Sequence, residues 1–239
     1  MNFNVSTAVC RWLDRQHIAY EFFQTTDSTN DQARLNAMAD PDCKVYLAHV
    51  QTKGRGRGQN TWSSSGEGGT LLATWSLHMA QPPGHLSGPL VGMSLFDSAK
   101  ATWPDLALSL KPPNDLYLND KKVAGLLLES LSMGQKHRLW AGLGLNVNAH
   151  PRELANAIHL GEALGGSVGL VDFEEFLGRW HNALLSARAD LSRAQLSLHQ
   201  KNKLTTALKA HPTLGAAIND VTVNGDIIYT DRVQKWSDL

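Results

Sequence analysis

Short segments rich in apolar, branched and aromatic residues recur through the first 150 residues. Separated by polar, proline-containing or glycine-containing turns, such segments predict β-strands. The predicted strands cover residues 18–24, 44–50, 70–79, 106–111, 116–119, 122–131 and 139–148. The polar turn Asn119–Asp120–Lys121 predicts a hairpin between two of them.

Helical patterns are fewer than strand patterns. Val9, Trp12 and Leu13 share one face of a predicted helix over 6–17, and the capping residues Ser28 and Thr29 mark the start of a second helix. Further helices are predicted over residues 88–101 and 172–191 and beyond residue 195. The strands cluster in pairs instead of alternating with helices, which predicts an α+β fold with a mixed sheet backed by helices. We expect a main domain over 1–190 and a small C-terminal region over 191–239, with one hairpin at Asn224–Gly225.

Composition limits the functional classes. With 239 residues and 42% hydrophobic residues, the chain can build a sizeable core. Lys plus Arg equals Asp plus Glu at 22 each, so any basic site must be local, and broad binding to DNA or to a membrane is not expected. The two cysteines and ten histidines show no metal-binding spacing, and we expect no metal site. No segment resembles a signal peptide or a bilayer span, which predicts a cytoplasmic protein.

The segment "QTKGRGRGQNTW", residues 51–62, has the chemistry of an anion-binding loop. Its glycines permit close backbone approach, consecutive amides can form an anion nest, and its arginines present planar donor forks. A solvated flexible loop and an RGG-like nucleic-acid contact are the alternatives. The segment is neither a Walker A loop nor a dinucleotide fingerprint.

Four other segments carry polar residues at strand or helix ends: "TDSTN" at 26–30, "KPPND" at 111–115, "KKVAG" at 121–125 and "GLGLNVN" at 142–148. The prolines of "KPPND" stiffen the entry to Asn114 and Asp115. Taken singly, each segment also has an ordinary structural explanation: an N-cap, a Pro-Asn-Asp turn, a solvated hairpin edge or a strand terminus with turn-forming asparagines.

Together and in this order, "STN", the 51–62 loop, "KPPND…KKVAG" and "GLGLNVN" resemble the biotin protein ligases. The resemblance covers roughly residues 28–148 and continues to about 190. It implies a class II aminoacyl-tRNA synthetase-like catalytic domain and two half-reactions. Biotin and ATP, with Mg²⁺, would give biotinyl-5′-AMP and pyrophosphate. A lysine of a biotin carboxyl carrier domain would then take the biotinyl group and release AMP.

The resemblance also implies roles for individual residues, assigned from the matched positions of this sequence. The implied catalytic residues are Lys122, Arg57 and Asp115. The implied biotin-binding residues are Ser28, Thr29, Asn30, Gln51, Gly54, Arg55, Gly56, Arg57 and Lys122. The implied nucleotide-binding residues are Trp62, Lys111, Asn114 and Asn146. Mg²⁺ is expected to arrive with the nucleotide and not in an all-protein cage.

The sequence departs from the family pattern in four places. Pro112 stands where the family usually has tryptophan, so a flat apolar wall is lost, and the 51–62 loop has fewer basic residues. Only 27 residues precede Ser28, too few for an N-terminal DNA-binding domain, and the tail shows one hairpin in place of a small barrel. The alternatives are a lipoate or octanoate enzyme of the same fold, although neither cysteine lies in a matched segment, and a non-catalytic biotin-binding protein. A monomer and a sheet-extended homodimer are both open.

Overall fold

The computed structural model describes residues 3–37, 39–66 and 68–238. Its internal contacts divide the chain into two compact units. Unit 1 comprises Met1–Pro82 and Val123–Leu177, and unit 2 comprises Pro83–Lys122 and Gly178–Leu239. These units are discontinuous in sequence and differ from the predicted domains over 1–190 and 191–239. Compact units and functional domains are separate descriptions of a chain, so the predicted domain division remains a prediction.

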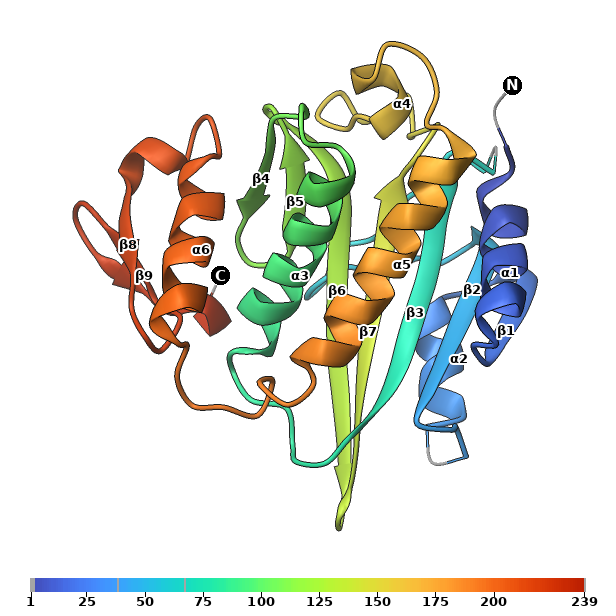
Figure 1. The fold of residues 1–239 in the computed structure, drawn as a ribbon, viewed down its shortest axis with the longest axis horizontal. Helices are drawn as coiled ribbons and strands as arrows, with labels where there is room; N and C mark the ends of the chain where they lie inside the picture. The colour runs from blue at the N-terminus through green and yellow to red at the C-terminus, as the bar shows by residue number, and fades with distance from the viewer. Residues whose placement is uncertain (1–2, 38, 67, 239) are drawn as a thin grey trace. The chain divides into compact units, whose positions relative to one another are not determined.

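Unit 1 is built on a mixed sheet whose strands lie in the order β1-β2-β3-β7-β6 (Figure 1). The strands are β1 (Tyr20–Thr26), β2 (Cys43–Gln51), β3 (Thr70–Met79), β6 (Lys121–Met133) and β7 (Lys136–Asn146). β1 and β2 run parallel, and the other neighbours are antiparallel. The predicted α+β fold with a mixed sheet backed by helices is therefore confirmed.

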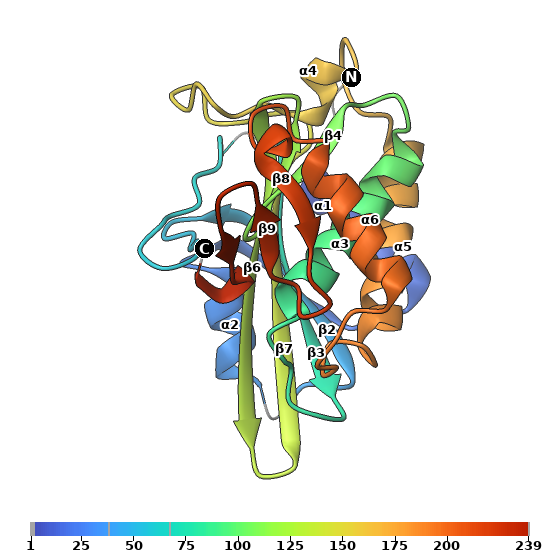
Figure 2. The same ribbon diagram turned by 90° about the vertical axis from the view of Figure 1, so that its left-hand side faces the viewer.

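The two faces of this sheet differ in chemistry because side chains alternate along each strand. One face, here called the polar face, carries Thr74 and Ser76 from β3 with Gly142, Gly144 and Asn146 from β7. The opposite face is a continuous apolar layer of leucine, alanine and tryptophan side chains, almost fully buried. Helices α1 (Val5–Gln16) and α2 (Thr29–Leu35) lie on opposite sides of the sheet, and α2 covers the polar face (Figures 1 and 2).

Unit 2 contains two small β-structures and the helices that pack on them. β4 (Leu108–Lys111) pairs with β5 (Asp115–Leu118), and α3 (Ser87–Thr102) and α6 (Leu198–Lys209) pack against β4. A second sheet has the order β10-β9-β8, formed by β8 (Ile218–Val221), β9 (Ile227–Tyr229) and β10 (Val233–Gln234). Short 3₁₀ helices, η1 (Gly215–Ala217) and η2 (Trp236–Asp238), complete the tail, and the chain passes from unit 1 into unit 2 within α5 (Leu170–Ala187).

The predicted elements differ from the structure mainly at their ends. β6 and β7 form one long hairpin that turns at Gly134 (φ 60°), whereas the sequence predicted strands that end at 131 and restart at 139. Polar residues Ser132, Lys136 and Arg138 obscured this strand pairing. Residues 149–166, for which no element was predicted, contain the short helix α4 (Leu160–Ala163), and the predicted helix 172–191 is α5. The Asn224–Gly225 turn is confirmed, with Gly225 at φ 82°, and β10 adds a third strand.

None of the described helices combines the length and the apolar composition that crossing a bilayer requires.

Candidate functional site

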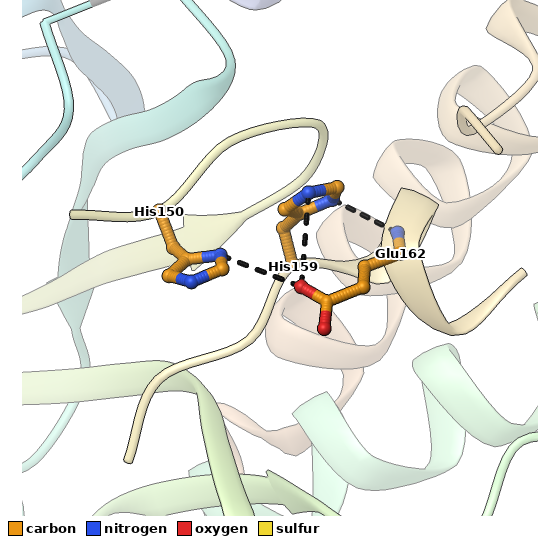
Figure 3. Close-up of side chains that lie close together, drawn as sticks. All are labelled: His150, His159 and Glu162. Carbon is orange, nitrogen blue, oxygen red and sulfur yellow. Dashed lines mark hydrogen bonds and ion pairs between the residues drawn. The ribbon is translucent and has the colours of Figure 1, made fainter. Parts of the chain in front are cut away.

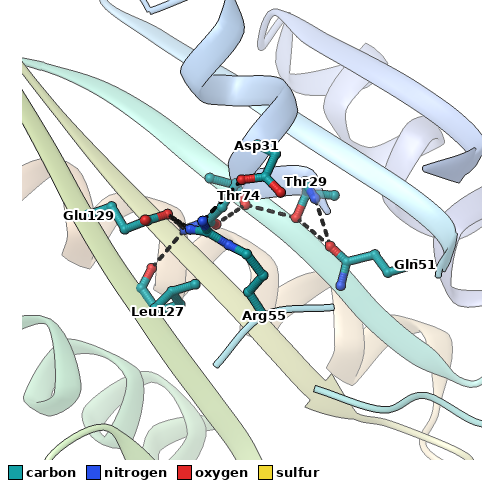
Figure 4. A network of polar contacts seen from close by, with 8 residues as sticks. Thr29, Asp31, Gln51, Arg55, Thr74, Leu127 and Glu129 are labelled. Atoms are coloured by element: carbon teal, nitrogen blue, oxygen red, sulfur yellow. Dashed lines mark hydrogen bonds and ion pairs between the residues drawn. The ribbon is translucent and has the colours of Figure 1, made fainter. Parts of the chain in front are cut away.

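A buried polar network on the polar face of unit 1 joins the start of α2 to the end of β2 (Figure 4). The backbone N–H of Thr29 donates to Gln51 Oε1 at 2.7 Å, and the Thr29 hydroxyl donates to the same oxygen at 3.0 Å. Thr29 is 4% exposed. The two bonds fix the orientation of the Gln51 amide, so that its Nε2 group is directed away from Thr29.

Thr74 and Asn30 extend this network across the sheet. The Thr74 hydroxyl, which is fully buried, lies 2.8 Å from Thr29 Oγ1 and 2.6 Å from Asn30 Oδ1 and shares its single proton between them. Asn30 Nδ2 donates to Leu127 O at 3.3 Å and to Glu129 Oε2 at 2.9 Å. Every polar atom of the Asn30 side chain is therefore used, as a buried amide requires.

Arg55 anchors the 51–62 loop to the same network through two carboxylates (Figure 4). Its guanidinium forms ion pairs with Asp31 Oδ1 at 3.2 Å and with Glu129 Oε2. Glu129 thus accepts from both Asn30 and Arg55. The two carboxylates offset the positive charge of Arg55. We therefore assign Arg55 the role of fixing the 51–62 loop to α2 and β6 through these ion pairs.

Two glycines of "GLGLNVN" make room for this arrangement. A Cβ atom on Gly142 would lie 2.2 Å from Asn30 Oδ1, and one on Gly144 would lie 2.4 Å from the Trp62 indole. The Asn30 side chain and the Trp62 ring therefore both pack directly against the backbone of β7. Any larger residue at Gly142 or Gly144 would displace Asn30 or Trp62.

The 51–62 loop is a folded turn with its ends tied together. Trp62 N–H donates to Gly54 O at 2.9 Å, and a Cβ atom on Gly54 would lie 2.3 Å from Trp62 O. Gly56 N–H donates to Asn60 O at 2.8 Å, and Gly58 has a φ of 65°. Half-buried Arg57 begins the final turn of the loop.

The base of the loop is also held by side-chain contacts. Thr52 and Lys53 bond to Asp27, at 2.7 and 2.9 Å, and hold the pKa of that carboxyl below its ordinary value. Ser28, predicted to bind biotin, is the N-cap of α2 and is 2% exposed, but its side chain makes no capping bond. Asn146 is 3% exposed and donates from Nδ2 to Ile158 O at 3.1 Å.

In unit 2, the predicted catalytic residues Lys122 and Asp115 form an ion pair. Lys122 Nζ lies 2.7 Å from Asp115 Oδ1. Burial raises the pKa of Asp115, while the charge of Lys122 and its hydrogen bond oppose this shift. The carboxyl is therefore a stronger base than an exposed aspartate, and it fixes one position for the ammonium group.

Lys111 and Asn114 lie at the ends of the turn between β4 and β5. Lys111 Nζ donates to the Tyr117 hydroxyl at 3.2 Å and lies 4.9 Å from the centre of the Tyr117 ring. His211 packs against the same tyrosine: the centres of the His211 and Tyr117 rings are 4.9 Å apart. Asn114 is half-buried at the turn, directly before Asp115.

His150, His159 and Glu162 form the one group of potential metal ligands found among the described residues (Figure 3). His159 Nδ1 accepts the N–H of Glu162 at 3.0 Å and caps α4, so this nitrogen is already used. Glu162 Oε2 lies 3.9 Å from His150 Nδ1 and 4.0 Å from His159 Nε2, and the Glu162 side chain is 47% exposed. We therefore assign His159 a capping role, and the sequence-based expectation of no metal site stays a prediction.

Sequence analysis missed three residues of the network: Asp31, Thr74 and Glu129. Thr74 and Glu129 lie in strands that carry other polar residues too, such as Ser76 and Ser130, so no local pattern singled them out. Their connection to Thr29, Asn30 and Arg55 depends on the pairing of β3, β7 and β6, which a single sequence does not specify.

Comparison with known proteins relates this chain to a described family. Residues 22–146, more than half of the chain, match the family model described as the biotin/lipoate A/B protein ligase family. A Mycobacterium tuberculosis protein named biotin–[acetyl-CoA-carboxylase] ligase is 30% identical over 189 residues, which cover 72% of this chain and 69% of that protein. The chloroplastic biotin–protein ligase 1 of Arabidopsis thaliana is 33% identical over 160 residues, 63% of this chain.

A solved structure shares the fold at low sequence identity. The Aquifex aeolicus biotin protein ligase, in complex with biotin and ATP, superimposes with a TM-score of 0.67 and 23% identity, over 91% of this chain and 94% of that one. Coverage of the sequence relatives is less complete, because the matched region spans 42% of the Arabidopsis protein.

Proposed function

Because this chain belongs to the biotin/lipoate A/B protein ligase family, we propose that it is an ATP-dependent biotin protein ligase. The reaction has two steps. The biotin carboxylate attacks the α-phosphorus of ATP, which forms biotinyl-5′-AMP and releases pyrophosphate. The ε-amine of a lysine on a biotin carboxyl carrier domain then attacks the acyl carbon, which forms an amide and releases AMP and a proton.

The observation that carries the proposal is the buried network of Thr29, Asn30, Gln51 and Thr74 on the polar face. A ureido ring offers two N–H donors and one carbonyl acceptor, and hydroxyl and amide groups at fixed positions complement both. Gln51 directs its Nε2 donor away from Thr29, which suits a ligand carbonyl. We assign biotin binding to Ser28, Thr29, Gln51 and the backbone of the 51–62 loop, including Gly54 and Gly56. Asn30, also expected to bind biotin, has all its side-chain polar atoms paired within the network, so we assign it the role of holding these groups in place.

The charged groups are assigned to the phosphate chemistry. Joining a carboxylate to a triphosphate brings two anions together, and cationic donors lower the cost of that approach and stabilise the charge that develops. We assign Arg57 and Lys122 to this role, with Arg55 as the loop anchor. Asp115 positions Lys122, and its raised pKa also suits a group that accepts the proton of the incoming lysine.

We assign Trp62, Lys111, Asn114 and Asn146 to the nucleotide. Mg²⁺ suits this chemistry as a partner of the triphosphate. Among the described residues the only three-ligand group contains two imidazoles, whereas Mg²⁺ prefers oxygen ligands and retains water. The residues therefore fit a Mg²⁺ ion that enters with ATP, where it would neutralise phosphate charge.

Pyrophosphate–ATP exchange tests the first step and the choice of acid. The proposal expects exchange that depends on biotin and is absent with lipoate or octanoate. Exchange with lipoate or octanoate and not with biotin would assign the chain to another branch of its family. Tight biotin binding without any exchange would instead identify a non-catalytic biotin-binding protein.

A further inference from the structure

Trp236, near the end of the chain, contacts the segment that carries Asn114 and Asp115. Its indole Nε1–H donates to Pro113 O at 2.9 Å, across 123 residues of sequence. The side chain belongs to η2, and the residue is 9% exposed. Both residues lie in unit 2. The carbonyl that accepts this bond immediately precedes the Asn114 amide.

Gly88, in the first turn of α3, lets the indole reach this position. A Cβ atom on Gly88 would lie 2.9 Å from Trp236 Nε1 and 3.2 Å from its Cδ1. The indole is thus held between the helix backbone on one side and the Pro113 carbonyl on the other. It also borders a cavity of about 380 Å³, lined by His85, Asn224, Asp226 and Lys235 together with Trp236 itself.

The two prolines of this segment limit its backbone hydrogen bonding. Neither Pro112 nor Pro113 has an N–H, so the turn between β4 and β5 lacks two of its backbone donors. The ladder between β4 and β5 reaches the turn at its last pair, Lys111 opposite Asp115. Trp236 supplies a donor from outside the turn, one residue before Asn114 and two before Asp115.

We propose that Trp236 is a positioning residue for adenylation: its indole N–H holds the Pro113 carbonyl and thereby sets the pose of Asn114 and Asp115. This rests on the proposed function, in which Asn114 contacts the nucleotide and Asp115 positions Lys122. Trp236 itself touches no reacting atom. The tail of the chain therefore contributes to ATP use through this bond.

The test compares three variants of the 239-residue protein. Trp236→Phe keeps an aromatic ring and removes the donor. Gly88→Ala keeps the tryptophan and pushes the ring away from Pro113 into the adjacent cavity. It should fold, because alanine favours a helix over glycine by about 1 kcal/mol. Trp103→Phe, at a tryptophan of the same unit that is 5% exposed, is the matched control.

The measurements are the KM for ATP in biotin-dependent pyrophosphate exchange, the Kd for biotin without ATP, and hydrogen exchange at the Asn114 and Asp115 amides. We expect Trp236→Phe and Gly88→Ala to raise the KM for ATP by roughly three- to tenfold, the effect of one net hydrogen bond. Both should speed amide exchange at residues 114–115 and leave the Kd for biotin unchanged. Trp103→Phe should alter none of the three.

The role of Trp236 alone would be overturned by one result: an active parent protein, with Trp236→Phe and Gly88→Ala variants that keep the parental KM for ATP and the parental amide exchange. Equal losses in all three variants would assign Trp236 a purely structural role and overturn the proposal as well. A parent with no biotin-dependent exchange would overturn the proposed function, and with it any role of Trp236 in adenylation.

Discussion

Thr74 connects Thr29 to Asn30, and replacing it with valine isolates the contribution of one hydroxyl. Valine keeps the shape of threonine, but Asn30 Oδ1, in a residue that is 3% exposed, loses its donor at 2.6 Å. A buried acceptor left without a partner costs about 1–3 kcal/mol, so we expect Thr74→Val to lower the free energy of unfolding by about 2 kcal/mol. For a chain of this length that corresponds to a decrease in Tm of roughly 4–8 °C.

Ser76 provides the matched control two residues further along the same strand. It is fully buried on the same face, and within the described part of the chain its hydroxyl has no hydrogen-bond partner. Removing an unpaired buried hydroxyl relieves a cost, so Ser76→Ala should be neutral or stabilising. Urea unfolding measures both variants, with m unchanged. The reasoning fails if Thr74→Val unfolds at the parental urea concentration or if Ser76→Ala is the more destabilised of the two.

Three further predictions concern charge. Lys122→Ala should slow biotin-dependent pyrophosphate exchange by about 10²-fold or more while circular dichroism stays parental, and a parental exchange rate would remove Lys122 from the proposed role. Arg57→Gly should release biotinyl-5′-AMP faster, so mass spectrometry should find biotin on bystander lysines; labelling confined to the carrier domain would contradict this. Burial, and to a lesser extent Lys111, lowers the pKa of His211, so the unfolded chain takes up a proton first and stability should fall as the pH drops below about 6.5. Urea midpoints between pH 7.5 and pH 5 should fall less steeply in His211→Asn, and parallel curves would show that His211 does not contribute.

Local sequence patterns were sufficient to predict most of the helices and strands and to select several residues of the polar network. Thr29, Asn30 and Gln51 come together because a helix start follows β1 and β2 ends beside it, and the two strands pair in parallel. Thr74 and Glu129 could not be predicted, because their side chains reach the site only through the register of β3, β7 and β6. The glycines of "GLGLNVN" looked like features of a strand end, whereas the structure shows that Asn30 and Trp62 require them.

The tail illustrates a second limit of sequence analysis. Pro112 suggested the loss of a flat apolar wall beside the segment proposed to bind the nucleotide. The structure brings an indole to the next residue, Pro113, from position 236. A contact across 123 residues has no local signal, since neither the helix period nor the strand period links the two positions.

Transfer of labelled biotin to a purified biotin carboxyl carrier domain tests the central claim most directly. With ATP, Mg²⁺ and the 239-residue protein, mass spectrometry should find one biotinyl group on the carrier lysine and none on a carrier whose lysine is replaced by arginine. Omission of ATP should abolish the product. No transfer to the intact carrier, from a protein that binds biotin and ATP, would contradict the assignment of this chain as a biotin protein ligase.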